Sequence, residues 1–300
     1  MNRILITGAS SMIGRHVVDK MNMLGYQVYP SYHKDVDLLC FEQTYKLFKE
    51  IMPNFVVHCA GYNGNIDFNR KYPSDIFYRT TQIGLNVLRC SEIFSSKTLS
   101  LLSSCAYPDE LDILPENTLW KGLPNNTVEC HGLAKRFLHA YAKQIYKQSG
   151  LICTSIILNT CYGPHDSFEI NKTKVVGGLI RKFMDAVKNN SDVECWGSGK
   201  VKREFIYVKD VVNLISILLF NYNSVEPLNI GTGKDITILE LANIIKELTG
   251  FKGKIYWNLN YPDGQQSKLL DVTRMKSFIN YEFTTLETGL SQTLEWYKNA

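Results

Sequence analysis

Short apolar runs alternate with longer amphipathic segments through the first two-thirds of this 300-residue chain. Five runs rich in Ile, Val and Leu are predicted to be strands buried on both faces, at residues 3–7, 27–29, 55–58, 98–103 and 153–158. The segments between them have helical patterns, at residues 14–24, 41–52, 73–94 and 127–148. This alternation predicts an α/β fold built on a doubly wound parallel sheet.

After Tyr162 the pattern changes, which predicts a second, smaller lobe. A loop at 163–174, a helix at 175–189 and a strand ending at Trp196 are expected there. Residues 203–220 look like a return to the main sheet, and residues 231–300 are expected to hold two helices and a loop at 261–266. We therefore expect a nucleotide-binding domain at 1–161, rejoined by 203–230. The smaller lobe would comprise 162–202 and 231–300, with a ligand between the two parts.

Composition excludes several classes of protein. The net charge of +4 is spread along the chain without a basic run, which argues against nucleic-acid binding but suits an anionic substrate. No stretch approaches the ~18 consecutive apolar residues of a membrane helix. The eight cysteines lack CxxC spacing and the first residues enter a strand directly, so we expect reduced thiols, no zinc and a cytoplasmic location.

A glycine-bracketed turn follows the first expected strand, with the sequence GASSMIG at residues 8–14. Glycine allows a tight turn and lets the backbone approach a pyrophosphate, which the N-terminus of the next helix stabilises. The residues of this turn expected to bind a dinucleotide are Gly8, Ser10, Ser11, Met12, Ile13 and Gly14. The usual short-chain pattern has a glycine in place of Ser11, so the turn alone is a weak signal.

The end of the second expected strand indicates which dinucleotide would bind. NAD sites place an acidic residue there to hold the ribose hydroxyls. This chain has His33 and Lys34 instead, which favours the 2′-phosphate of NADP(H). The alternative is that both residues belong to a solvated loop without a ligand.

Several further motifs resemble one family closely and in order. They are SSCAYP at 103–108, HGLAK at 131–135, CYGPHDSF at 161–168, WGSG at 196–199, REFIYV at 203–208, NIGTG at 229–233 and KLLD at 268–271. Together these resemble the GDP-L-fucose synthase branch of the extended short-chain dehydrogenase/reductases, nearly end to end. The resemblance implies a Rossmann domain with a C-terminal substrate-binding lobe, a GDP-linked 4-keto sugar as substrate, NADP(H) as coenzyme and a homodimer. It places the dimer interface on residues 73–94 and 127–148.

The resemblance also implies roles for individual residues. Ser103 would bind the substrate carbonyl, Lys135 the nicotinamide ribose, and Cys105 would act as an acid/base in epimerisation. The alternative for Cys105 is a small filler at a strand end. Further coenzyme contacts are expected at Ala60, Gly61, Leu101, Leu102, Leu158, Asn159 and Cys161. Further substrate contacts are expected at Ser104, Asn159, Lys174, Lys182, Trp196, Arg203 and Lys268.

At two positions this chain differs from the family pattern, and these differences limit which of the family's activities can be expected of it. The family's general acid is a tyrosine four residues before the lysine, and His131 stands there. His131 and Lys135 would share a helix face. Because imidazole ordinarily titrates near about 6.5, an imidazolium at this position would suit proton donation. The family's second epimerisation residue, a histidine, aligns with Lys174, and lysine is a poor base unless it is desolvated.

We therefore predict an NADPH-dependent C4 ketoreductase of a GDP-4-keto sugar, of the 6-deoxyhexose or heptose type, for surface polysaccharides. His131 would be its proton donor, and its epimerase activity would be mostly or wholly lost. Two alternatives stay open. One is a bifunctional GDP-L-fucose synthase, and the other is a non-catalytic nucleotide-sugar-binding protein in which His131 is a spectator.

Overall fold

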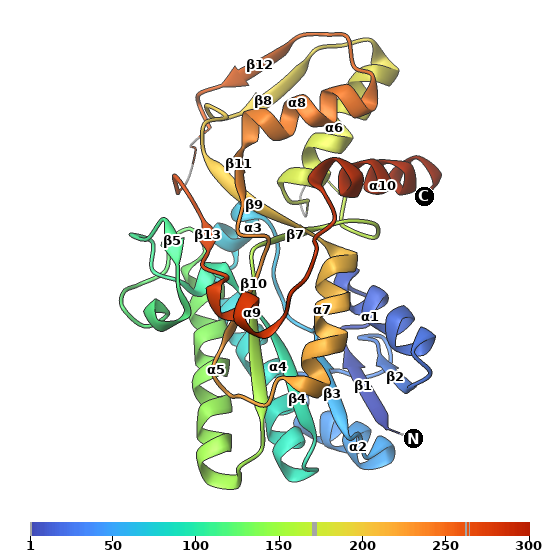
Figure 1. Ribbon diagram of the computed structural model, residues 1–300, viewed down its shortest axis with the longest axis vertical. Coiled ribbons are helices and arrows are strands. Elements are labelled where there is room, and N and C mark those ends of the chain that lie inside the picture. Colours follow the sequence, from blue (N-terminus) through green and yellow to red (C-terminus); the bar gives the residue numbers. More distant parts are fainter. Residues whose placement is uncertain (1, 170–172, 262, 264) are drawn as a thin grey trace.

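The computed structural model describes residues 2–169, 173–261, 263 and 265–300. A six-stranded parallel sheet lies at the centre of its larger part (Figure 1). The strands are ordered β10 (Leu228–Ile230), β6 (Cys153–Leu158), β4 (Lys97–Ser103), β3 (Phe55–His58), β1 (Arg3–Thr7) and β2 (Gln27–Ser31). The order reverses beside β1, and in open parallel sheets ligands bind at the carboxyl ends of the strands at such a point. The predicted α/β class is confirmed.

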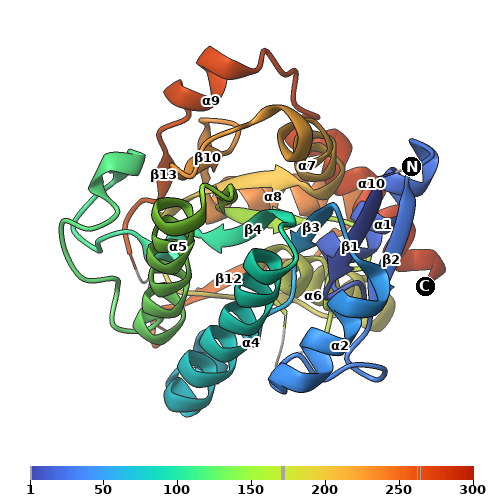
Figure 2. The ribbon, with the colours of Figure 1, turned by 90° about the horizontal axis from the view of Figure 1, so that it is seen from below.

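Helices cover both faces of this sheet (Figure 2). On one face lie α1 (Met12–Met23) and α7 (Val208–Asn221), and on the other lie α2 (Phe41–Ile51), α4 (Pro73–Ile93) and α5 (Glu129–Ser149). Their apolar side chains enclose β1, where Ile4 and Ile6 pack toward α1 while Leu5 packs toward α2 and α4. The sheet is therefore buried on both faces, as the apolar runs predict.

The predicted boundaries need small corrections, which local capping explains. Helix α1 begins at Met12 rather than at Gly14, because the Ser11 hydroxyl caps it by accepting from Gly14 N at 3.1 Å. Helix α5 begins at Glu129 rather than at Thr127, since Thr127 N is engaged by Asn125 Oδ1 at 3.0 Å. Strand β2 runs on to Ser31, and β4 starts at Lys97.

A smaller set of elements lies above the carboxyl edge of the sheet (Figure 1). It contains a three-stranded sheet of β11 (Asp235–Thr237), β9 (Lys202–Tyr207) and β7 (Thr160–Tyr162). It also contains the strand pair β8 (Val193–Trp196) and β12 (Ile255–Asn258), with helices α6 (Val175–Asn189), α8 (Ile238–Thr249) and α10 (Leu286–Asn299). The remaining elements are α3 (Ile66–Lys71), α9 (Thr273–Phe278), two single turns at Ser104–Ala106 and Glu116–Thr118, and the pair β5 (Ile113–Leu114) and β13 (Leu269–Leu270).

Two details of the C-terminal part differ from what the sequence pattern indicates. The strand within 203–220 does not rejoin the main sheet, because β9 pairs with β7, placing Phe205 beside Thr160. The strand that enters the main sheet is β10, beside β6. Residues 231–300 hold three helices among those described rather than two, since the six-residue α9 is too short to produce a clear period. The predicted loops at 163–174 and 261–266 lie partly outside the described residues.

Helix α1 lies unusually close to the turn that precedes it. A Cβ at position 14 would collide with the carbonyl oxygen of Gly8, and one at position 8 would lie 2.6 Å from Ala60 N. Gly8 also has φ +67°, whereas Ser11 has φ −71°, which any residue adopts. The turn therefore requires glycine at positions 8 and 14 but not at position 11.

Replacement of Gly14 by alanine should lower the free energy of unfolding by about 2 kcal/mol, because the new methyl group meets backbone atoms that cannot move aside. Denaturant unfolding measures this. The matched control is Gly61→Ala, whose Cβ would meet only Lys135 Nζ, at 3.8 Å. Equal effects of the two substitutions would contradict the steric explanation.

Candidate active site at the carboxyl edge of the sheet

The first turn offers donors to an anion. The N–H groups of Met12 and Ile13 lie in the first turn of α1 and have no carbonyl one turn earlier to bond with. The hydroxyl of Ser11 closes the turn from within by donating to Gly8 O at 2.8 Å. Exposed Ser10 stands beside it. With the close backbone approach that Gly8 and Gly14 allow, this turn fits the pyrophosphate of a dinucleotide.

The residues that are expected to bind the 2′-phosphate of the coenzyme follow β2, next to this turn. Ala9 N donates to Ser31 O at 3.2 Å, which brings the end of β2 beside the glycine turn. His33 and Lys34 follow two and three residues later and are both exposed. Lys34 Nζ lies 5.9 Å from the centre of the Tyr32 ring, so its cation is held near the strand end.

Lys135 reaches the same edge of the sheet from α5. It is 7% exposed, and its Nζ donates to Leu101 O at 2.8 Å. A Cβ on Gly61, in the loop after β3, would lie 3.8 Å from Lys135 Nζ. Burial lowers the pKa of Lys135 to about 8, against the opposing effect of the Cys59 thiol. Gly8, Ala60, Gly61, Leu101 and Lys135 therefore converge.

His131 lies one turn before Lys135 and is 6% exposed. Its Nδ1 is buried, with no hydrogen-bond partner among the described residues. Burial, and then the charges of Lys135 and Lys174, lower the pKa of His131 to about 3. The expectation of a ready imidazolium is therefore wrong for this site, because at neutral pH the ring is neutral.

The start of α5 is pressed against the turn that follows β4. A Cβ on Gly132 would collide with the carbonyl oxygen of Cys105, so the helix and the turn make backbone contact. Ser103, at the end of β4, accepts from Cys105 N at 3.2 Å through its hydroxyl. This contact sets Ser103 and Cys105 beside the first turn of α5, which carries His131.

Two cations of the smaller lobe act on Cys105. Lys268 Nζ lies 4.0 Å from Cys105 Sγ. Burial lowers the pKa of Arg203, and electrostatic interactions with Cys105 and Asp263 oppose that shift, so Arg203 is in electrostatic range of both. Cys105, Arg203 and Lys268 thus form one group, although the sequence separates them widely.

A fully buried carboxylate holds the loops of this site together. Glu204 Oε1 accepts from Gly233 N at 2.8 Å, and Oε2 accepts from Leu270 N at 3.1 Å and from Asn159 Nδ2 at 3.3 Å. Asn159 also donates to Lys268 O at 2.7 Å and accepts from Ser104 Oγ at 3.1 Å. Sequence reasoning did not single out Glu204, although it lies in the REFIYV motif, because no pattern shows that a charged residue in a strand is buried.

The remaining residues expected at the site divide into two groups. Leu102, Leu158 and Cys161 are buried, and burial raises the pKa of the Cys161 thiol, so only their backbone could face a coenzyme. Lys174 is exposed and occupies the N-cap position of α6, where its side chain makes no capping hydrogen bond. It belongs to the site through its electrostatic effect on His131.

Lys182 and Trp196 meet on the smaller lobe, away from the turn. Lys182 Nζ lies 4.4 Å from the centre of the Trp196 ring and donates to Glu194 O at 2.9 Å. The ring of Tyr261 stacks on that of Trp196, with the ring centres 4.3 Å apart and an interplanar angle of 10°. Sequence reasoning missed Tyr261, which no motif marks.

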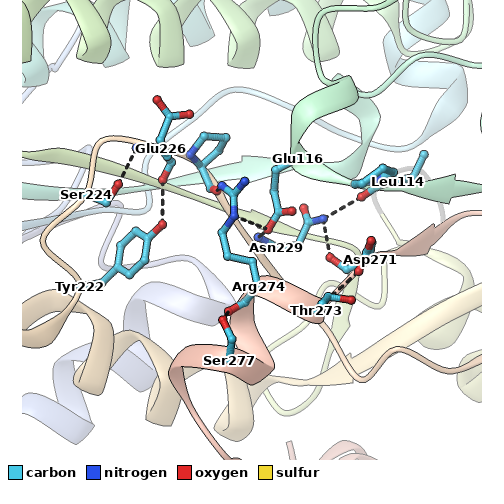
Figure 3. Close-up of polar contacts among 12 residues, drawn as sticks. Leu114, Glu116, Tyr222, Ser224, Glu226, Asn229, Asp271, Thr273, Arg274 and Ser277 are labelled. Carbon is cyan, nitrogen blue, oxygen red and sulfur yellow. Dashed lines mark hydrogen bonds and ion pairs between the residues drawn. The ribbon is translucent and has the colours of Figure 1, made fainter.

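A second buried network fixes β13 beside the main sheet (Figure 3). Asn229 Nδ2 donates to Leu114 O at 2.7 Å and to Asp271 O at 2.9 Å, while Asn229 N donates to Glu116 Oε1 at 3.1 Å. The Tyr107 hydroxyl donates to Asn229 Oδ1 at 2.8 Å. The tyrosine of the SSCAYP motif is therefore a buried structural residue, and the KLLD segment is held in place at its end.

Substitution of Glu204 by alanine should destabilise the fold by about 3 kcal/mol, because it leaves buried N–H groups of two segments without acceptors. Thermal or denaturant unfolding provides the measurement. The exposed Glu282→Ala is the matched control and should have little effect. A cost below about 1 kcal/mol would mean that the loops are held by other contacts.

Comparisons with known proteins identify the family of the chain. The NAD dependent epimerase/dehydratase family matches residues 4–231. The GDP-L-fucose synthase of Dictyostelium discoideum is 32% identical over 305 residues, covering 98% of this chain and 94% of that protein. The GDP-L-colitose synthase of Yersinia pseudotuberculosis is 30% identical over 302 residues, covering 99% and 98%.

Two solved structures resemble the fold closely. The GDP-L-fucose synthetase of Naegleria fowleri bound to NADP has a TM-score of 0.93 at 26% identity, covering 99% of this chain and 93% of that one. A GDP-mannoheptose C4 reductase of Campylobacter jejuni with NADP bound has a TM-score of 0.90 at 26% identity, covering 99% and 98%. The chain belongs to the NAD dependent epimerase/dehydratase family, and within it to the relatives of GDP-L-fucose synthase.

Proposed function

We propose that this protein reduces the C4 ketone of a GDP-linked 4-keto sugar with NADPH, the sugar being a 6-deoxyhexose or a heptose. The convergence of Ser103, His131 and Lys135 beside a dinucleotide-binding turn carries this proposal. The names of the relatives support it, since they include synthases of GDP-fucose and GDP-colitose and a C4 reductase of a GDP-heptose.

The residues at the turn fit NADP(H). The N-terminus of α1 would hold the pyrophosphate, and His33 and Lys34 would meet the 2′-phosphate. Lys135, next to Gly61, would hold the nicotinamide ribose. NADPH supplies the hydride when it is bound. The chain itself must orient the ketone, stabilise the developing alkoxide and provide a proton.

The cations of the smaller lobe suit the diphosphate of the substrate. Arg203 and Lys268 flank Cys105, and Lys182 lies further out, over Trp196. Guanidinium and ammonium groups are the usual partners of phosphate oxygens. We place the sugar between these cations and Ser103, with the nucleotide directed toward Trp196 and Tyr261.

His131 would serve as a neutral acid, as tyrosine does in the family. Its ring is neutral at pH 7, so it would offer an N–H group to the ketone oxygen. When that proton moves to the alkoxide, an imidazolate remains. The charges of Lys135 and Lys174 disfavour an imidazolium but stabilise an imidazolate, so the same two cations that lower the pKa of the ring assist this transfer.

Epimerisation is proposed to be lost or weak. Moving a proton from one face of a carbon to the other needs an acid/base group on each side. Cys105 could serve on one side, but exposed Lys174, just before α6, stands where the family has its histidine. We assign Lys174 to charge stabilisation instead, since it acts on His131.

The bifunctional GDP-L-fucose synthase is kept as an alternative, because Cys105 retains a cationic neighbour in Lys268. A non-catalytic nucleotide-sugar-binding protein is the other. Measuring NADPH oxidation with a panel of GDP-4-keto sugars distinguishes an enzyme from a binding protein, since a binding protein would oxidise no NADPH with any of them.

Assembly and location also stay predictions. A homodimer would use the outer faces of α4 and α5, where Phe77, Tyr78 and Phe137 are exposed. No helix among the described residues is long and apolar enough to span a membrane. The cytoplasmic location predicted from the sequence suits the eight free thiols.

His131→Phe should lower kcat at least about 100-fold, the usual contribution of a general acid, while His131→Tyr should retain most of the activity. For the wild-type enzyme, kcat/KM should fall above about pH 8, as the Lys135 ammonium loses its proton. Steady-state rates across pH measure both. Reduction by His131→Phe at the wild-type rate would contradict the role of His131. An alkaline limb near pH 6.5 that moves upward in His131→Tyr would instead show an imidazolium donor.

The loss of epimerisation is tested with a GDP-4-keto sugar incubated with the enzyme in D2O. We expect little deuterium at C3 and C5 by NMR, because Lys174, which stands in place of the family's second histidine, is a poor base. Lys174→His is the informative variant, since it restores the family residue and should increase incorporation. Rapid incorporation by the wild-type enzyme would reinstate the bifunctional alternative.

A further inference from the structure

A cavity of about 720 Å³ lies on the side of the small sheet that faces α10, apart from the site described above. Residues 279–285, here called the strap, connect α9 to α10 (Figure 1), and they line the cavity together with residues of β9 and β11. The cavity lies between the strap and these strands. Its volume is in the range of small-molecule sites, about 300–1,000 Å³.

The pleat of β9 separates this cavity from the loops of the active site. Successive strand residues point to opposite faces. Glu204 points toward Asn159 and Leu270, whereas Phe205 faces the cavity together with Tyr162 of the neighbouring strand. Neither the glycine turn nor Ser103, His131 or Lys135 lines it. Arg203 lines the cavity and is also in electrostatic range of Cys105.

The walls combine an apolar body with a cationic end. Tyr162, Phe205 and Ile236 form the sheet side, and Phe283 of the strap faces the same space. Arg203, Lys234 and Lys276 line one end, and a Cβ on Gly233 would lie 3.7 Å from Lys276 Nζ. No ion pair involving Lys234 or Lys276 is present within the described part of the chain.

The lining also contains two acids, fewer than its cations. Glu282 and Glu287 line the cavity and are exposed. Glu287 lies in the first turn of α10, where the helix dipole stabilises a carboxylate. The three cations Arg203, Lys234 and Lys276 therefore outnumber the two acids among the lining residues.

The strap is anchored at one point of α7. The buried carboxylate of Asp210 accepts from the Tyr281 hydroxyl at 2.9 Å and from Thr284 N at 3.0 Å, and Asn213 Nδ2 donates to Tyr281 Oη at 3.1 Å. The cavity is thus a fixed feature of the fold.

We propose that this cavity binds a small organic anion, a phosphate or carboxylate carried on a flat apolar body. The anionic group would meet Lys234 and Lys276, and the flat body would lie between Phe205 and Phe283. Because Arg203 borders both sites, an occupant would also draw this guanidinium away from the diphosphate and weaken binding of the GDP-sugar.

The test uses the full-length enzyme saturated with NADP+ and GDP, so that the active site is filled. Calorimetry with 4-nitrophenyl phosphate should show one further site per chain. Titration with 4-nitrobenzoate shows whether a carboxylate serves as well as a phosphate. The double variant Lys234→Glu/Lys276→Glu should bind at least about tenfold more weakly, equivalent to about 1.4 kcal/mol. Lys252→Glu, an exposed charge reversal elsewhere on the lobe, should bind as the wild type does.

Hydrogen exchange locates the occupant independently of any variant. Amides of the strap should gain protection when 4-nitrophenyl phosphate binds, and the KM for the GDP-sugar should rise with its concentration. The proposal is overturned if the wild-type enzyme binds neither probe at millimolar concentration. It is equally overturned if more GDP displaces the probe, or if the double variant binds like Lys252→Glu. None of these outcomes depends on His131, so the reductase proposal stands or fails separately.

Discussion

The buried carboxylate of Glu204 is the constraint on which the geometry of the active site depends. Three segments far apart in the sequence, ending at Asn159, Gly233 and Leu270, place donors on its two oxygens. A buried carboxylate is costly unless its lone pairs are satisfied, so these loops cannot move independently. Through Asn159 the same network reaches Ser104 and Lys268, which border the reactive end of the site.

The electrostatics of the site follow from this arrangement. Cations come from α5, α6, β9 and the segment before β13, while the buried carboxylate of Glu204 already accepts hydrogen bonds from backbone and amide donors. The proposed diphosphate of the substrate suits such a site, and the same cations affect which acid can work beside the proposed sugar. An imidazolium is disfavoured near Lys135 and Lys174, whereas a neutral donor that becomes an anion is favoured. His131 and tyrosine are equivalent in that respect.

Much of the fold could be read from local patterns. The strands at 3–7, 55–58 and 153–158 are those predicted, since a strand buried on both faces must be a continuous apolar run. The sequence did not predict that β9 pairs with β7, because an apolar strand pattern does not identify the neighbouring strand. Of the site, the motifs identified Ser103, Cys105, His131 and Lys135 as candidates, but not the neutral state of His131, which results from burial.

The sequence by itself determined the α/β class, the glycine turn and the family, because these depend on periodicity and on short motifs with fixed spacing. The tertiary structure decided what those residues experience. Desolvation, the distance between Cys105 and Lys268, and the burial of Glu204 arise only when segments separated by scores of residues pack together. The acidity and the charge of a side chain in this site depend on that packing and cannot be derived from its residue type alone.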